Sequence, residues 1–544
     1  MSHVEEMGET RPEGVDESTP PRPSFPFVLE FLLVLTIFAI VGGSRIVPGY
    51  NEDHYLSKAR HFWQPEWNSG DFFLSTADAH AVFYILVGWL ANFLPMDLYA
   101  WAVRFAEWSL LALGWVVLNR AVVPFPGFSV VSALLFAGLQ RNTSMAGEWV
   151  IGGAESKGFA WAFVFWGLAN AVRGRWSVAV VWLGLATALH VLVGGWAALV
   201  LAAVWILVGR RDESWKSLLV GGLVGLVLAS AGLIPALMLN REVDPEVVAQ
   251  ANVIHVHERL PHHLYPPAFK QEKVRRYLLT IGAWLLIAPW SLRHESSRRF
   301  QLFVVISCAI TIAGLAIVWL TRNDAAAQAS LLRYYWFRSA DITVPMGLCL
   351  GVGLLVESLW ERRRGWAIGV LLIALAVGGW NSIDRIRQNW RIGLPHIFHQ
   401  DLDSDEANRA SYRAWRETCR WIEENTPPDA VFLTDANWRT LGWYAGRGEV
   451  VNWKQVPQDA ASVVEWRERN RRLHGDVKSL SQRSKLNQKD PDHLVSVGAQ
   501  LGATHAVTRA TPPLSLPVLY ENDYFRVYSL EGEEPATTSP AKDR

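Results

Sequence analysis

The sequence predicts a polytopic α-helical membrane protein with a soluble α/β domain at its C-terminus. Of 544 residues, 51% are hydrophobic and 19% are charged, whereas about a quarter would be charged in an ordinary soluble protein. Apolar segments of spanning length, about 17–25 residues, recur as far as residue 381, and charges are dense beyond it. The 28 Trp residues agree with this class, because Trp is enriched where membrane meets water.

Twelve apolar segments predict the transmembrane helices, of which we expect about 11–13. Two of them, 81–95 and 128–140, are short and could be half-spans or re-entrant segments. The segments are 26–44, 81–95, 99–118, 128–140, 158–172, 177–190, 192–208, 217–238, 276–292, 300–320, 341–357 and 366–381.

Loop charges predict the orientation of these segments, since cytoplasmic loops carry an excess of Lys and Arg. The basic clusters that we place in the cytoplasm are Arg173–Arg175, Arg210–Arg211, Arg293–Arg299 and Arg362–Arg364. The loops at 239–275 and 321–340, and the chain after about 382, are then outside. A protein with its N-terminus inside and its C-terminus outside needs an odd number of spans, so one segment between 81 and 140 is re-entrant or one span is missing.

The chain divides into four predicted parts. They are a disordered tail at 1–25, a membrane domain at 26–381 with its first outside loop at 45–80, an extracytoplasmic α/β domain at 382–531, and a disordered tail at 532–544. In the α/β domain we expect a helix at 412–425, an exposed helix and linker at 465–489, and strands at 430–435, 449–454, 505–509 and 524–530. The net charge of zero argues against a nucleic-acid partner.

The first outside loop holds the most informative cluster of polar residues. Glu52, Asp53 and His54 are adjacent, and Asp78 and His80 follow before the next apolar segment. A carboxylate pair at the mouth of a helix bundle can take a proton from an acceptor hydroxyl, or bind a divalent cation such as Mg²⁺ or Mn²⁺. The structural alternative is a solvated loop with interfacial aromatic anchors.

A second cluster, Glu148, Glu155 and Lys157, lies where an apolar segment begins. Ionisable groups at membrane depth are costly and tend to be functional. In the interfacial layer the same residues would cost little, so both interpretations stay open. His190, alone in an apolar segment, is expected to hydrogen-bond a neighbouring helix.

Two later outside loops are rich in His and Arg. Arg259, His262 and His263 lie in one of them, where an anion site suits them better than a metal site. Arg333 and Arg338 flank a Tyr-Tyr-Trp-Phe block in the other and could grip a phosphate. On a regular helix these two arginines would lie about 140° apart, so the alternative is an aromatic belt with snorkelling arginines.

These loops together resemble the GT-C superfamily of membrane glycosyltransferases, which use polyprenyl-phosphate-linked sugars. The motifs EDHYL, DAH, ESKGF, PHHLYP, RYYWFR and WYAGRGEVVNWK are most similar to a family of bacterial polytopic membrane proteins without an established activity. The chain departs from the Asp-x-Asp signature of some GT-C enzymes at Glu52-Asp53-His54.

The resemblance implies an enzyme of the bacterial inner membrane, a hexosyl- or pentosyltransferase that works at the outer face. Its partners would be the lipid bilayer, a polyprenyl-phosphate sugar donor and a glycan, lipid or protein acceptor. Glu52 or Asp53 would be the catalytic base or a metal ligand, Glu148 or Glu155 would line the cavity, and an outside arginine would bind the lipid phosphate. His54, His80 and His263 are candidates for donor contacts. The alternative is a non-catalytic scaffold or transporter with a periplasmic interaction domain.

Overall fold

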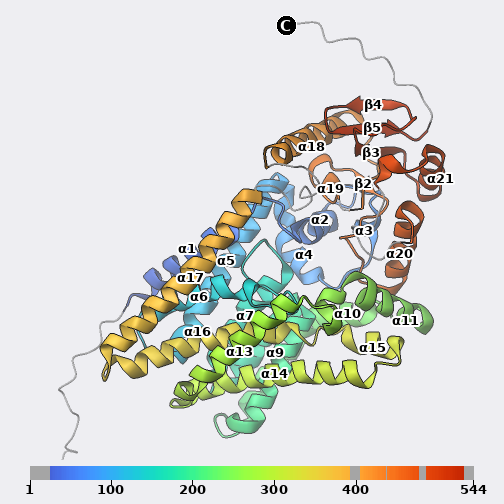
Figure 1. Cartoon of the computed structure of the whole chain (residues 1–544). Helices are drawn as coiled ribbons and strands as arrows, with labels where there is room; N and C mark the ends of the chain where they lie inside the picture. Colours follow the sequence, from blue (N-terminus) through green and yellow to red (C-terminus); the bar gives the residue numbers. More distant parts are fainter. Residues whose placement is uncertain (1–24, 393–404, 437, 477–484, 532–544) are drawn as a thin grey trace, which may run out of the picture.

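The computed structural model describes residues 25–392, 405–436, 438–476 and 485–531. It confirms the predicted class, since a bundle of apolar helices carries a small mixed α/β domain near the C-terminus (Figure 1). The expected tails at 1–25 and 532–544 lie outside the described residues, apart from residue 25.

The helical part is built from seventeen labelled α-helices. They are α1 (Phe27–Gly43), α2 (Glu52–Trp63), α3 (Phe72–Ser75), α4 (Ala81–Gly88), α5 (Met96–Val122), α6 (Phe128–Asn142), α7 (Ser156–Val172), α8 (Trp176–Leu189), α9 (Val191–Val204), α10 (Trp215–Met238), α11 (Pro245–Val253), α12 (Pro261–Leu264), α13 (Gln271–Ser291), α14 (Glu295–Leu320), α15 (Ala325–Leu332), α16 (Arg338–Trp360) and α17 (Arg364–Ile392).

Each of the twelve predicted apolar segments corresponds to a helix in this set. Within the described residues, six helices are long and apolar enough to cross a membrane: Met96–Val122, Val191–Gly209, Trp215–Met238, Glu295–Leu320, Arg338–Trp360 and Arg364–Asn389. Shorter apolar helices are Phe27–Gly43, Ala81–Asn92 and Trp176–Leu189. The number of helices that cross the bilayer therefore stays a prediction, as do the domain boundaries, except that α17 runs past the boundary predicted at 382.

The C-terminal part contains α18 (Asp405–Asn425), α19 (Leu441–Ala445), α20 (Ala460–His474) and α21 (Pro491–Leu501). Its strands are β1 (Val431–Leu433), β2 (Gly448–Glu449), β3 (His505–Arg509), β4 (Val518–Glu521) and β5 (Phe525–Ser529), in the spatial order β2-β1-β3-β5-β4. β1 is parallel to β2 and β3, whereas β5 is antiparallel to β3 and β4.

The strand predictions at β1, β3 and β5 are confirmed, and two details differ. The run at 449–454 forms only the short β2, and the carbonyls of Trp453 and Lys454 accept hydrogen bonds from Arg259 of the membrane domain instead. β4 was not predicted, and Pro517 directly precedes it. Proline is tolerated at the start of an edge strand such as this one.

The predicted first outside loop forms helix rather than irregular chain, and it docks on the C-terminal domain. In Figure 1, α2 and α3 lie next to β2 and α19. Asp71 accepts a hydrogen bond from the Glu449 amide at 3.0 Å, and Arg439 donates one to the Tyr50 carbonyl at 2.6 Å. The C-terminal domain therefore borders the candidate site at the first outside loop.

Glycines bring α8 and α10 into close contact. A Cβ atom on Gly184 would lie 2.3 Å from the Gly225 carbonyl oxygen, and one on Gly225 would lie 2.7 Å from the Val180 carbonyl oxygen. Small residues at such contacts let membrane helices pack by van der Waals attraction. Gly222, on the same helix, faces open space, since a Cβ atom there would meet nothing within 4 Å.

We expect Gly225→Leu to destabilise the detergent-purified protein, by roughly 1–3 kcal/mol as for other overpacked sites. The added side chain would push α8 and α10 apart. Thermal unfolding of Gly225→Leu should show a lower midpoint than the wild type, and Gly222→Leu should not. Equal midpoints for the two variants would contradict the close helix contact.

Candidate active site

Glu52, one of the two predicted catalytic acids, forms a buried ion pair with Arg104 of α5. The two carboxylate oxygens face Nε and Nη2 of the guanidinium, the latter at 2.7 Å. Glu52 also accepts hydrogen bonds from the amides of Gly49 and Ala154. Both charged side chains are fully buried. Every oxygen of Glu52 is therefore engaged in holding the protein together.

The segment between α6 and α7 is held by other buried acceptors in the same way. Asp341 accepts from the amides of Met145 and Ala146, at 2.7 and 2.9 Å, and Gln140 accepts from that of Val150 at 2.7 Å. Glu107 accepts from the amide of Glu155 at 2.8 Å. These bonds satisfy amides that would otherwise be costly to bury and fix the directions of Glu148 and Glu155.

Asp53 differs from its neighbour Glu52. It is 1% exposed, yet neither carboxylate oxygen has a hydrogen-bond partner among the described residues. Its nearest cation is Arg439, whose Nε lies 3.6 Å from Oδ2. Burial raises the pKa of Asp53, and Arg439 and Lys454 oppose that shift. A buried carboxylate with free lone pairs is suited to accept a proton or a hydrogen bond from a ligand.

Arg439 and Lys454 come from the C-terminal domain, and neither was predicted as a site residue. Lys454 ends the motif WYAGRGEVVNWK, which was the one signal for it in the sequence. Burial lowers its pKa to about 7, helped by Arg259 and Arg439 and opposed by Asp53 and Glu155. Lys454 is thus an electrostatic neighbour of both Asp53 and Glu155.

The second predicted cluster comes together as a chain of ion pairs. Nζ of Lys157 lies 3.2 Å from Glu155 and 3.4 Å from Glu148. Glu148 also lies 3.0 Å from Nε of Arg338. The oxygens of Glu148 and Nε of Arg338 have no hydrogen-bond partner in the described part of the chain. The charges are therefore paired, but hydrogen-bonding capacity remains for a ligand.

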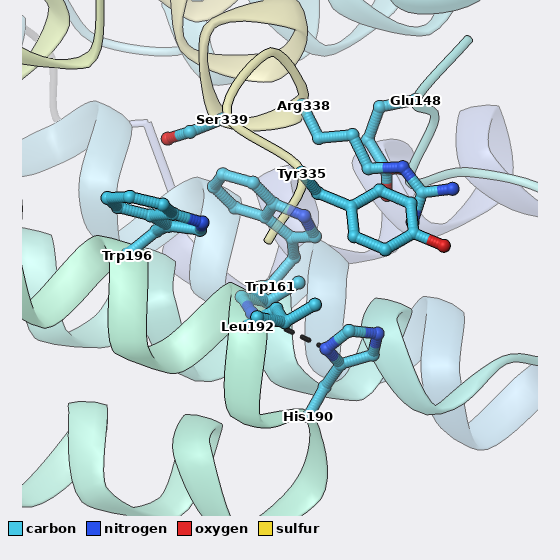
Figure 2. Close-up of a pocket in the computed structure, with 9 residues that line it drawn as sticks. Glu148, Trp161, His190, Leu192, Trp196, Tyr335, Arg338 and Ser339 are labelled. Carbon is cyan, nitrogen blue, oxygen red and sulfur yellow. Dashed lines mark hydrogen bonds and ion pairs between the residues drawn. The ribbon is translucent and has the colours of Figure 1, made fainter. Parts of the chain in front are cut away.

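Arg338 and Glu148 line a narrow cavity. Figure 2 shows Arg338, Tyr335 and Glu148 close together, with Trp161, Trp196 and His190 along other sides. The Arg338 guanidinium lies 3.9 Å from the centre of the Tyr335 ring. Tyr335 has a φ of 59°, which is uncommon for a bulky residue and recurs at functional sites.

The interruption of the helix at Tyr335 explains why Arg333 and Arg338, the two predicted phosphate-binding arginines, have different surroundings. α15 ends at Leu332 and α16 begins at Arg338, so no continuous helix carries both. Arg338 enters the cavity, whereas Arg333 donates to Asn252 Oδ1 at 2.7 Å.

Asp78, His80 and His54 come from the first outside loop, and His190 lines the cavity at Arg338. Asp78 pairs with His80 at 2.7 Å and with Lys58 at 3.6 Å; burial favours a raised pKa, but His80 and Lys58 lower the pKa of Asp78 below its usual value. The His80 ring lies 5.3 Å from that of His190, which lines the cavity. His54 is held in contact with Phe73 at 4.5 Å, and burial lowers its pKa to about 3.

The predicted anion site around Arg259 is built differently. Nε and Nη2 of Arg259 donate to the carbonyls of Trp453 and Lys454, at 2.9 and 3.0 Å. His263 pairs with the Ala146 carbonyl, and its ring centre lies 4.1 Å from that of the tilted His262 ring. Arg259 thus ties the membrane domain to the C-terminal domain, while Arg338 acts electrostatically on both histidines.

The donor set around Asp53 suits a proton acceptor better than Mg²⁺ or Mn²⁺. Arg439 and Lys454 put positive charge beside Asp53, and Lys157 does so for Glu155; each of these cations disfavours a divalent ion. No group of three His, Cys, Asp or Glu side chains placed to hold a metal occurs among the described residues.

A protein-family model matches part of the C-terminal domain. Residues 413–473 match a family described as a domain of unknown function (DUF6798), and this segment contains both Arg439 and Lys454. No curated protein matches the sequence.

Three solved structures are similar to the chain. The arabinofuranosyltransferase AftD from Mycobacteria (mutant R1389S) is 14% identical over 94% of this chain and 42% of that chain, with a TM-score of 0.51. ArnT from Cupriavidus metallidurans bound to undecaprenyl phosphate is 14% identical over 92% and 97%, with a TM-score of 0.49. The oligosaccharyltransferase AglB from Archaeoglobus fulgidus, in complex with an inhibitory peptide and a dolichol-phosphate, is 12% identical over 89% and 69%, with a TM-score of 0.42.

The likeness to AftD shows the fold: this chain is a multi-pass membrane protein with the GT-C architecture. The resemblance drawn from the sequence motifs is confirmed at that level. At such low identity it carries no residue roles, which rest on the geometry above.

The contrast between Glu52 and Asp53 predicts opposite stability effects for two adjacent substitutions. Glu52→Gln leaves Arg104 buried without its charge partner, a change that typically costs about 3 kcal/mol or more. Asp53→Asn removes a buried carboxyl group whose pKa is raised in the folded protein. The ionised carboxylate destabilises the fold above that raised pKa, and this destabilisation is absent below the unfolded-state pKa of about 4. At neutral pH, thermal unfolding should therefore show Glu52→Gln well below the wild type and Asp53→Asn equal to it or higher. The reverse order would exchange the roles of the two acids.

Proposed function

We propose that this chain is a glycosyltransferase that moves a sugar from a polyprenyl-phosphate-linked donor to an acceptor at the outer face of the bacterial inner membrane. The observation that carries the proposal is Asp53, a buried carboxylate without a hydrogen-bond partner among the described residues. It lies in a GT-C fold, and Lys454 acts electrostatically on both Asp53 and Glu155. Glu155 belongs to the chain of ion pairs that ends at Arg338 in the cavity. The neighbours named above support the substrate class, since one is an arabinofuranosyltransferase and others were solved with undecaprenyl phosphate or dolichol-phosphate.

The roles follow from charge and placement. Asp53 takes the proton of the acceptor hydroxyl while the acceptor oxygen bonds to the anomeric carbon of the sugar. The bond from that carbon to the carrier phosphate oxygen breaks, and the phosphate leaves with the electron pair. Arg338 and Lys157 stabilise the charge that develops on it, which is how preorganised donors accelerate such steps. No metal ion is needed for this balance of protons and charge.

The remaining predicted site residues have positioning roles in this proposal. Glu148 and Glu155 hold Lys157 and Arg338 in place through their ion pairs. The Asp78–His80 pair faces His190 on the edge of the cavity. With Asp53 as the base, Glu52 acts as the structural anchor of the loop that carries it.

Asp53→Asn should abolish transfer while leaving the protein folded. In cells that depend on this protein, we expect the variant to lose a specific glycoconjugate and to accumulate its lipid-linked donor, measured by mass spectrometry of lipid and glycan extracts. Asp492→Asn, an exposed aspartate of α21, is the matched control and should give the wild-type profile. A wild-type profile from Asp53→Asn would point to the alternative, a scaffold that needs no base.

Lys454 should set the pH range in which transfer occurs. Its positive charge lowers the pKa of Asp53, so Lys454→Met lets that pKa rise, and a higher pH is then needed to keep the base deprotonated. The acid limb of the pH–activity profile should move to higher pH. Lys216→Met, at an exposed lysine in the first turn of α10, should leave the limb in place, and an unmoved limb in Lys454→Met would remove Lys454 from the site.

A further inference from the structure

Three arginines meet at a second place, away from the Arg338 cavity. Arg45 follows α1, Arg141 is near the end of α6, and Arg385 is in the last part of α17. Together they line a narrow cavity whose other walls include Trp149 and Gly152. None of these residues lines the cavity at Arg338.

The three guanidinium groups lack an acidic partner. In the described part of the chain none of them forms an ion pair, and their side-chain hydrogen bonds amount to one contact of 3.4 Å from Arg45 to Asn389. Arg385 is only 9% exposed. Arg45 and Arg141 contact the Tyr50 ring, at 4.0 and 4.8 Å from its centre, but this ring is uncharged. Burying a cation without an anionic partner is costly, so the arrangement suits an anion that completes it.

The nearest carboxylates are already engaged elsewhere. Glu52 acts on Arg45 but is paired with Arg104, and Glu155 acts on Arg141 but lies 3.2 Å from Lys157. Burial, together with Arg141 and Arg104, lowers the pKa of Arg45 to about 8. The cluster therefore has an excess of positive charge that no acidic side chain among the described residues balances.

An apolar groove lies beside the cluster. Its walls are Ile40 of α1, Trp101, Phe105 and Trp108 of α5, and Ile386 of α17. Phe105 is 57% exposed on this outer surface of the bundle. Ile386 is the chain neighbour of Arg385, and both the groove and the arginine cavity are lined by residues of α1 and α17.

We propose that this arginine cluster and groove bind a membrane lipid with a negatively charged phosphate headgroup. The phosphate lies among Arg45, Arg141 and Arg385, since guanidinium groups bind phosphate oxygens through paired donors. The hydrocarbon chains lie in the groove against Trp101 and Phe105. The apolar groove next to the cluster, on the same two helices, favours a lipid over free phosphate. This binding does not depend on the proposed transfer reaction, because the residues involved are different.

The test is the thermal stability of the full-length protein in nanodiscs of phosphatidylcholine with and without phosphatidylglycerol. We expect phosphatidylglycerol to raise the unfolding midpoint of the wild type by several degrees, since a ligand that binds the folded state stabilises it. Arg385→Gln and Arg141→Gln should each lose at least half of this rise. In phosphatidylcholine alone both variants should be as stable as the wild type or more so, because each removes an unbalanced buried charge.

Arg362→Gln, an exposed arginine between α16 and α17, is the matched control and should retain the full rise. The proposal is overturned if phosphatidylglycerol gives no rise, or if Arg385→Gln and Arg362→Gln respond alike. It is also overturned if inorganic phosphate in phosphatidylcholine nanodiscs reproduces the whole rise, which would make the site one for a soluble anion. A loss of stability of Arg385→Gln in phosphatidylcholine would show that the arginine is balanced within the protein.

Discussion

The Glu52–Arg104 ion pair is the contact on which the rest of the site depends. One carboxylate joins α5, the turn at Gly49 and the buried segment at Ala154, so three separate parts of the chain share a single acceptor. Buried pairs of this kind contribute less to net stability than to fixing one arrangement, and removing one partner is costly. Here the arrangement sets the first turn of α2, and the next residue of that turn is Asp53.

The charges around this pair divide into two groups with different surroundings. Towards α7, α9 and α16 the cations Lys157 and Arg338 have carboxylate partners, so the cavity there is close to electrically balanced. Towards α1, α6 and α17 the arginines have none among the described residues. A balanced site can admit a ligand that changes its charge during a reaction, whereas an unbalanced one favours a ligand that stays charged.

The sequence predicted the class, the positions of the apolar helices and most of the charged clusters, because hydropathy and charge patterns are local properties. It could not decide between Glu52 and Asp53, since the deciding partner, Arg104, lies inside an apolar segment of α5 far along the chain. Arg439 was missed for the same reason: only docking of the C-terminal domain brings it to Asp53. Whether Arg333 and Arg338 could face one ligand was predicted for a regular helix, but the left-handed backbone of Tyr335 interrupts the helix between them.

The cost of an unpartnered Asp53 is itself an argument for function. A buried carboxylate without hydrogen bonds destabilises a protein, and a neutral asparagine or an apolar residue would remove that cost. Two cations of the C-terminal domain instead favour the charged form of Asp53: Arg439 lies at 3.6 Å, and Lys454 acts on it from the same domain. Neither cation hydrogen-bonds it, so its lone pairs remain available to a ligand. The C-terminal domain thus acts as more than an appendage, because it supplies the positive charge that opposes the rise in the pKa of a membrane-domain carboxylate.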